Sequence, residues 1–126
     1  MKHSVQLWSK LVGQLVAFSL LEGAIVLLWR DNVLLFIVLL VAGLAVLSLW
    51  HDRYDVSFFV VIAALGSLAE AVFVLFGVWR YANPTLLGVP LWFPLAFGTS
   101  GLIGARLVLT ITQLWEEARS SRSSNG

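Results

Sequence analysis

The stretch RDNVLLFIVLLVAGLAVLSLWHDRYD, residues 30–55, decides the fold of this chain. Its centre, residues 33–50, contains no charged side chain and is bounded on both sides by short polar turns. A helix that rises 1.5 Å per residue would extend about 27 Å over this run, close to the thickness of a bilayer core. The run therefore predicts one membrane-spanning helix with a tight turn at each end.

Three further apolar runs surround this one, at residues 5–29, 56–79 and 93–115. The composition agrees with them, because 60% of the residues are hydrophobic and 12% are charged, whereas soluble domains carry about 25% charged residues. The first two connections are so short that successive helices must lie antiparallel and adjacent. The sequence predicts an all-α integral membrane protein in which residues 1–115 form an antiparallel bundle of four transmembrane helices.

Tryptophans and basic residues mark the ends of these helices. Indole rings prefer the headgroup level of a bilayer, and basic residues near helix ends are enriched on the cytoplasmic side. The six tryptophans all lie at or near predicted ends: Trp8, Trp29, Trp50, Trp79, Trp92 and Trp115. One side of the bundle carries Lys2, Lys10, Arg53, Arg119 and Arg122, against Arg30 and Arg80 on the other. We expect a multi-pass plasma-membrane protein with both termini in the cytoplasm.

Two segments depart from the pattern of regular spans. Residues 81–92 contain Pro84 and Pro90, so we expect an irregular segment at the outer surface that leads into the fourth helix. Residues 116–126 are polar and rich in serine, and we expect them to form a disordered tail.

Three charged residues fall inside the predicted spans, and each is a functional candidate because charge is costly there: Glu22, Glu70 and Arg106. A helical side chain leans toward the N-terminus of its helix. For Arg106 that direction is outward, so we expect it to contact Glu70 and leave Glu22 without a partner. The pair could serve helix packing, or it could belong to a polar site for a ligand, a substrate or a proton.

Small residues predict where the third and fourth helices touch. Gly66 lies on one stripe of the third helix, and Ala96, Ser100 and Gly104 recur every four residues on the fourth. Stripes of this kind let two helix backbones approach closely. The helix over residues 33–50 has no charged residue and only Ser48 as a hydroxyl, so we expect it to face lipid or a second copy in a homo-oligomer.

Several kinds of chemistry find no support in the residues. The chain contains no cysteine, which excludes disulfides, thiolate catalysis and cysteine–zinc sites. Phosphate-binding glycine loops and zinc-protease motifs are absent, and His3 and His51 are far apart at the membrane edge. We expect no cofactor and no metal. The net charge of +1 gives no reason to expect nucleic acid as a partner, and the composition predicts the lipid bilayer as the surroundings of the chain.

The most distinctive stretch runs from Glu70 through Gly77-Val-Trp-Arg-Tyr81 and Asn83-Pro84 to Gly88-Val-Pro-Leu-Trp-Phe-Pro-Leu-Ala-Phe97. It resembles the acid, glycine, tyrosine and "GVPL..PLAW" pattern of the carotenoid biosynthesis membrane-protein family, although Phe97 stands where that pattern has tryptophan. That family includes carotenoid hydratases, which add water across a terminal isoprenoid double bond. The stretch is also similar to small bacterial and archaeal polytopic membrane proteins with an ExxxxxxGxWxYxNPxxxGVPLWxPL signature.

The resemblance implies an isoprenoid or lipid ligand and a site at Glu70, Tyr81, Asn83 and Pro90, with Glu70 as the catalytic acid of a hydratase-like enzyme. From the residues alone, the candidates for ligand binding are Glu22, Glu70, Tyr81, Asn83, Trp92 and Arg106. Three roles stay open at this point. The chain could be an accessory or lipid-binding membrane protein, an isoprenoid-modifying enzyme, or a small proton-coupled transporter that works as a homodimer.

Overall fold

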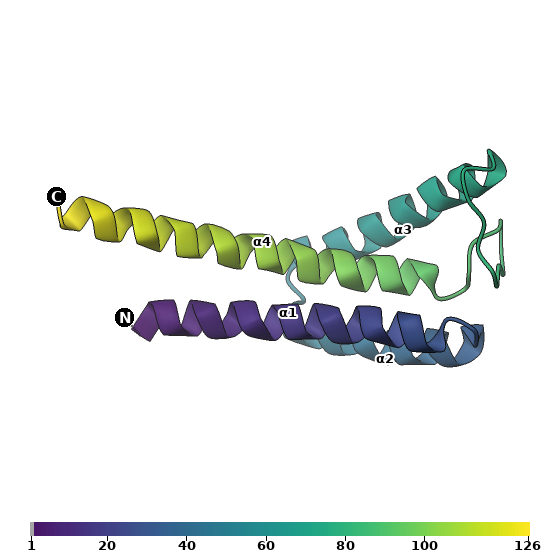
Figure 1. The fold of residues 1–126 in the computed structure, drawn as a ribbon, viewed down its shortest axis with the longest axis horizontal. Helices are drawn as coiled ribbons and strands as arrows, with labels where there is room; N and C mark the ends of the chain where they lie inside the picture. Colours follow the sequence, from purple (N-terminus) through teal and green to yellow (C-terminus); the bar gives the residue numbers. More distant parts are fainter. Residues whose placement is uncertain (1) are drawn as a thin grey trace.

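The structure is a computed structural model that describes residues 2–126, and Met1 lies outside the described part. Residues 2–126 form four α-helices (Figure 1): α1 Lys2–Leu28, α2 Asn32–Leu49, α3 Arg53–Leu75 and α4 Phe93–Ser124. All four are long and apolar enough to cross a membrane. The predicted all-α bundle of four membrane-spanning helices is confirmed. The expectation that α2 and α3 lie adjacent is wrong, because α2 packs on α1 and α4 whereas α3 packs on α4.

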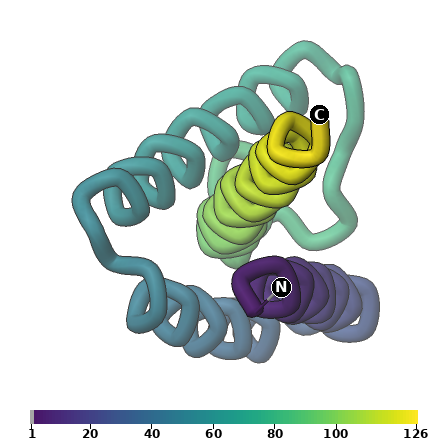
Figure 2. Tube along the Cα trace, turned by 90° about the vertical axis from the view of Figure 1, so that its left-hand side faces the viewer, coloured from purple at the N-terminus to yellow at the C-terminus, as the bar shows by residue number. Residues whose placement is uncertain are grey.

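Helix α4 is the centre of the bundle. It packs against each of the other helices, with α1 and α2 on one side and α3 on the other (Figure 2). Both termini lie at one end of the molecule (Figure 1), which we call the terminal end. The opposite end, the loop end, carries the α1–α2 turn and the irregular segment 76–92. α1 and α4 extend past the α2–α3 turn toward the terminal end.

Aspartates begin two of the helices. Asp31 is the N-cap of α2, and its side chain accepts a hydrogen bond from the N–H of Leu34 at 3.0 Å. Asp52 caps α3 through a capping box, in which Asp52 Oδ1 accepts from the N–H of Asp55 and Asp55 Oδ2 accepts from the N–H of Asp52. α3 therefore begins at Arg53, earlier than the predicted start at residue 56, because Asp52 is the cap and Asp55 is the third residue of the helix.

Helix α3 also ends earlier than predicted, at Leu75 rather than at residue 79. Gly77 adopts a positive φ of 74°, a conformation that glycine reaches without steric cost. The N–H of Gly77 donates to the carbonyl of Val74, and the N–H of Val78 donates to the carbonyl of Phe73. These two bonds form a Schellman motif, which closes the helix and reverses the chain. The irregular segment therefore spans residues 76–92, slightly longer than the predicted 81–92.

The prediction of a disordered tail is wrong, because α4 continues through residues 116–124. Glu, Ala and Arg in this stretch are good helix formers, and no glycine interrupts them before Gly126. Glu117 also ties the extension to α1. Its Oε2 accepts a hydrogen bond from Ser4 Oγ at 2.7 Å, and its Oε1 lies 3.3 Å from Nε2 of His3.

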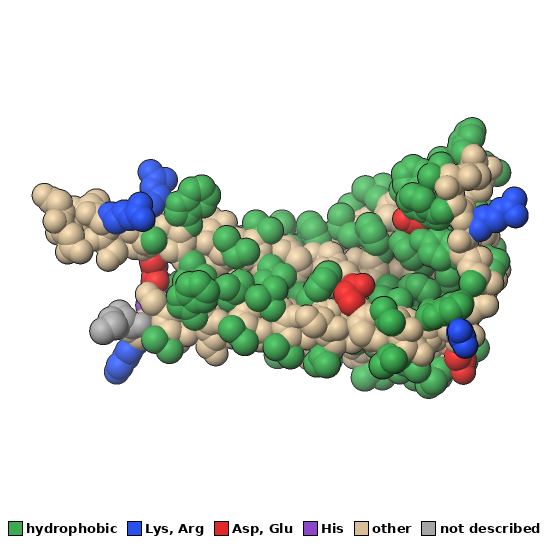
Figure 3. Space-filling model, viewed as in Figure 1, with side chains coloured by type: hydrophobic (Ala, Val, Ile, Leu, Met, Phe, Trp, Pro, Cys, Tyr) green, Lys and Arg blue, Asp and Glu red, His purple; other side chains and the backbone are tan. Residues whose placement is uncertain are grey.

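The surface of the bundle is largely apolar. Hydrophobic side chains cover most of the visible length of the helices, and the Lys and Arg side chains gather at the two ends (Figure 3). Leu27 and Leu75, for example, are 81% and 80% exposed. Apolar side chains on this scale are stable only against hydrocarbon, so the surface agrees with a multi-pass membrane protein.

Close packing between α3 and α4 depends on glycines. A Cβ atom built on Gly66 would overlap the ring of Phe97, and one on Gly98 would lie 3.0 Å from the ring of Phe59. A Cβ on Gly104 would meet no atom within 4 Å. The predicted contact at Gly66 is therefore present, whereas Gly104 does not take part in the packing.

Candidate functional site

Side-chain hydrogen bonds hold segment 76–92 against the α1–α2 turn. Nδ2 of Asn32 donates to the carbonyl of Asn83 at 2.8 Å, and Nε1 of Trp92 donates to Oδ1 of Asn32 at 3.1 Å. Nδ2 of Asn83 donates in turn to the carbonyl of Trp29 at 3.0 Å. Trp92 is buried in the protein rather than placed in a lipid-facing belt. Asn83 and Trp92 thus meet through Asn32, and their polar atoms position the segment.

Glu70 lies in the last turns of α3 and accepts two hydrogen bonds on one oxygen. Oη of Tyr81 donates to Glu70 Oε2 at 2.7 Å, and Nε1 of Trp79 donates to the same oxygen at 2.8 Å. These donors reach Glu70 because the turn at Gly77 folds the chain back along α3. The structure therefore brings the predicted Glu70 and Tyr81 together and adds Trp79, which the sequence analysis treated only as a boundary marker.

Tyr81 keeps its proton at neutral pH. Burial raises the pKa of its phenol well above the ordinary value of 10.0, and the hydrogen bond to Glu70 and the charge of Glu70 raise it further. The ring packs edge-to-face on Phe93, with centroids 5.9 Å apart. Tyr81 is consequently a fixed hydrogen-bond donor to Glu70.

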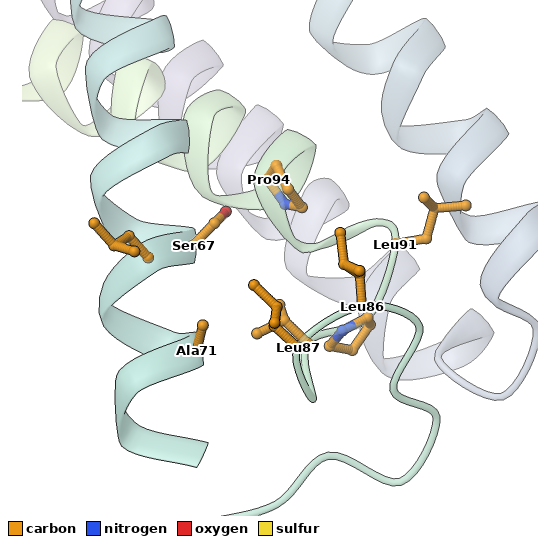
Figure 4. Close-up of a pocket in the computed structure, with 9 residues that line it drawn as sticks. Ser67, Ala71, Leu86, Leu87, Leu91 and Pro94 are labelled. Atoms are coloured by element: carbon orange, nitrogen blue, oxygen red, sulfur yellow. The ribbon is translucent and has the colours of Figure 1, made fainter. Parts of the chain in front are cut away.

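An apolar groove lies beside this cluster, between α3 and residues 86–94 (Figure 4). Its volume is about 310 Å³, and a second cavity of about 330 Å³ adjoins it through the shared residues Ala71 and Leu87. Ser67 is the one polar residue among those that line it, and within residues 2–126 its buried Oγ has no hydrogen-bond partner. The other lining residues are Leu68, Ala71, Leu86, Leu87, Val89, Pro90, Leu91 and Pro94.

One wall of the groove is a tight turn in an unusual conformation. Leu87 and Gly88 have φ values of 54° and 79°, and Leu86 and Val89 pair across the turn. Positive φ at both central residues defines a type I′ turn, which favours Asn or Gly over a bulky residue such as leucine. A Cβ on Gly88 would overlap Val74, so the turn lies directly against α3. In this strained conformation the side chain of Leu87 lies over the groove (Figure 4).

Glu22 lies apart from the Glu70 cluster. Its Oε1 accepts a hydrogen bond from Oγ of Ser100 at 3.0 Å, which joins α1 to α4. The expectation that Glu22 lacks a partner is therefore wrong, because Ser100 of the small-residue stripe on α4 faces it. In this contact the neutral hydroxyl of Ser100 donates to the carboxyl group of Glu22 within the membrane-spanning part of the bundle.

The predicted contact between Arg106 and Glu70 is also wrong. Nε of Arg106 donates to Oδ1 of Asp55 at 3.0 Å, Nη2 pairs with Oδ2 of Asp55, and Nη2 lies 3.5 Å from Oδ2 of Asp52. Asp55 and Glu70 are about 22 Å apart along α3. Arg106 lies nearer the terminal end than Glu70 does. Its long side chain reaches the carboxylates of Asp52 and Asp55 at the membrane boundary, although helical side chains tend to lean toward the N-terminus of their helix, here the loop end.

The Arg106 contacts form a compact charged cluster at the start of α3. Asp55 is fully buried, and the guanidinium carbon of Arg106 lies 5.5 Å from the ring centroid of Trp50. The pKa of Asp52 is lowered from its ordinary value of 3.8, first by the hydrogen bond from the N–H of Asp55 and also by the charge of Arg106. Neither aspartate was among the predicted site residues, although both lie next to an apolar run, as capping residues do.

The described residues contain no group of three or more His, Asp or Glu side chains placed to hold a metal ion. The structure therefore offers two distinct features at the loop end, the Glu70–Tyr81–Trp79 cluster and the apolar groove. A third feature, the Asp55–Arg106 pair, lies toward the terminal end. Comparisons of the chain with protein-family models, with curated proteins and with solved structures give no match.

Proposed function

We propose that this protein binds the hydrocarbon chain of a membrane lipid, of the isoprenoid or acyl class, in the groove between α3 and residues 86–94. The observation that carries the proposal is the groove itself, with eight apolar residues and Ser67 along its walls. Ligand pockets have this character, being mostly apolar with a few polar groups. The unpartnered Oγ of Ser67 can donate to a carbonyl or hydroxyl oxygen of the ligand.

Binding fits the geometry better than catalysis of hydration. An acid that protonates an alkene must point an O–H at the substrate carbon. Glu70 is an acceptor in both of its hydrogen bonds, with Tyr81 and Trp79, and it is not among the residues that line the groove. The hydratase-like enzyme and the proton-coupled transporter stay as alternatives, and for the transporter Glu22 is the residue to test.

Filling the groove should abolish ligand binding. In Ser67→Phe the new ring would occupy the cavity, so photo-crosslinking to a diazirine-bearing polyprenol or phospholipid should fall by about tenfold or more. Leu65→Phe adds the same ring on the exposed face of α3, where Leu65 is 58% exposed, and should crosslink as the wild type does. Competition with unlabelled polyprenol or phospholipid tells the two chain classes apart. Equal crosslinking of Ser67→Phe and Leu65→Phe would contradict the proposal.

Leu87→Gly should separate binding from stability. Glycine adopts the positive φ of Leu87 without strain. The free energy of unfolding of the variant should therefore equal that of the wild type or exceed it by up to about 1 kcal/mol. It also removes an apolar wall of the groove, so crosslinking should fall. A turn with a purely structural role would change stability alone, and crosslinking at the wild-type level would point to that role.

For orientation we propose a plasma-membrane location with both termini in the cytoplasm, on the basis of the five basic residues near the terminal end. The chain has no cysteine, so single-cysteine variants need no prior substitution. Ser121→Cys should resist a membrane-impermeant maleimide in intact cells, and Ala82→Cys in the irregular segment should react. The reverse labelling pattern would place the termini outside.

A further inference from the structure

A polar cavity lies between α1 and α4, far from the apolar groove. Its volume is about 420 Å³. Two of the lining residues, Lys10 and Arg106, are cations, and the lining contains no acid. Gln14, Thr110 and Gln113 add amide and hydroxyl groups, and Ala17, Leu49 and Leu109 add apolar surface. A cationic, polar cavity is unusual in a bundle with so apolar a surface.

The cavity lies at the depth of lipid headgroups. Trp50, which follows the last residue of α2, is part of its lining. The 18 residues of α2 extend about 27 Å, so the two ends of α2 mark the two faces of the hydrocarbon layer. The cavity is therefore level with the phosphates of the leaflet at the terminal end.

Several polar groups that line the cavity have unused hydrogen-bonding capacity. Gln14 is 8% exposed, and within residues 2–126 its Oε1 has no hydrogen-bond partner. Lys10 forms no ion pair in the described part of the chain. Arg106 uses Nε and Nη2 to bind the aspartates, which leaves the N–H groups of Nη1 for another acceptor. A buried polar atom without a partner is costly, so a ligand that supplies one gains binding energy.

We propose that this cavity binds the headgroup of an anionic phospholipid that also carries a hydroxyl group, the chemistry of phosphatidylglycerol. The phosphate accepts hydrogen bonds from Nζ of Lys10 and Nη1 of Arg106, and a glycerol hydroxyl donates to Oε1 of Gln14. Asp55 neutralises most of the charge of Arg106, so Lys10 supplies the net attraction. Basic pockets between transmembrane helices recognise anionic headgroups in this way. The acyl chains run past Ala17, which lies deeper along α1 than Lys10, toward the membrane centre.

The test measures lipid retention by native mass spectrometry. Delipidated protein receives phosphatidylglycerol, phosphatidylethanolamine or phosphatidylcholine with identical acyl chains. Wild type should retain phosphatidylglycerol about fivefold more than phosphatidylcholine, and Lys10→Gln should lose most of that preference, as expected for one charge at the headgroup level. A separate comparison uses phosphatidic acid, which lacks the headgroup glycerol: Gln14→Leu should lower retention of phosphatidylglycerol and leave retention of phosphatidic acid unchanged.

Lys2→Gln is the matched control, because it removes a lysine from the same helix outside the cavity and should bind as wild type does. All variants are checked for equal thermal unfolding in lipid-free micelles. Equal retention of the three lipids by wild type, or equal losses in Lys10→Gln and Lys2→Gln, overturns the proposal. So does displacement of phosphatidylglycerol by millimolar glycerol phosphate, which would identify a site for soluble phosphate esters. Failure of this proposal would not contradict the groove proposal, because Ser67 lines the groove and not this cavity, so Ser67→Phe tests the groove separately.

Discussion

Replacing Arg106 with methionine is expected to lower the free energy of unfolding by about 3–5 kcal/mol. Asp55 is fully buried, and Arg106 is its only cationic partner in the described chain. The substitution leaves a carboxylate in a low-dielectric site with its backbone contact to Asp52 but no compensating charge. An unpaired buried charge is among the few changes that destabilise a protein this strongly.

Removing Asp55 is expected to cost less than removing Arg106. In Asp55→Leu the guanidinium of Arg106 keeps Asp52 and the ring of Trp50, and its side chain is 25% exposed, so water can reach it. The double variant Arg106→Met/Asp55→Leu should therefore be close in stability to Asp55→Leu alone. This would be the signature of a strongly coupled pair.

The measurement is SDS-induced unfolding in lipid-free mixed micelles, followed by circular dichroism, so that the proposed headgroup cavity does not contribute. Glu116→Gln serves as the control, because Glu116 is exposed and forms no ion pair within residues 2–126. Its unfolding should match that of wild type. Similar unfolding of Arg106→Met and Glu116→Gln would show that the pair does not stabilise the bundle.

The helices could be predicted from the sequence because they follow from local composition. Long uncharged runs such as residues 33–50 have one stable state in hydrocarbon, since every backbone polar group must be satisfied within the helix. Helix ends were less accurate, because the capping box at Asp52 and the Schellman turn at Gly77 depend on single side chains and φ angles. Gly77 was in fact readable as a stop signal, being a glycine near the end of an apolar run.

The polar contacts were harder to predict, because they depend on depth and direction rather than on residue type. Arg106 was assigned to Glu70 on the direction in which a helical side chain leans, yet it pairs with Asp55 nearer the membrane boundary. An arginine side chain is long enough to extend toward either end of its helix, and Arg106 pairs with the nearer carboxylate, that of Asp55 at the membrane boundary. Glu70 and Tyr81 were both candidate site residues with no predicted contact, and they meet because the chain reversal between them is short in sequence.

Gly66→Ala is expected to destabilise the bundle by about 1–3 kcal/mol, the cost of overpacking a close helix contact. The new Cβ would overlap Cγ, Cδ1 and Cε1 of Phe97. Because Cγ lies on the axis of ring rotation, turning the ring of Phe97 about χ2 would not relieve the overlap. Either α3 shifts away from α4, or Phe97 leaves its stacked position on Phe93, where the ring centroids are 5.4 Å apart.

Gly104→Ala is the matched substitution with the opposite expected sign. Its Cβ meets nothing within 4 Å, so only the intrinsic preference of the helix for alanine remains, worth up to about 1 kcal/mol of stabilisation. If the Gly66 effect comes from overlap with Phe97, Gly66→Ala should cost much less in a Phe97→Ala background, because alanine lacks the Cγ, Cδ1 and Cε1 atoms that the new Cβ would overlap. Equal changes in the free energy of unfolding for Gly66→Ala and Gly104→Ala would mean that α3 and α4 do not meet at this point. An undiminished cost of Gly66→Ala when Phe97 is also replaced would mean the same.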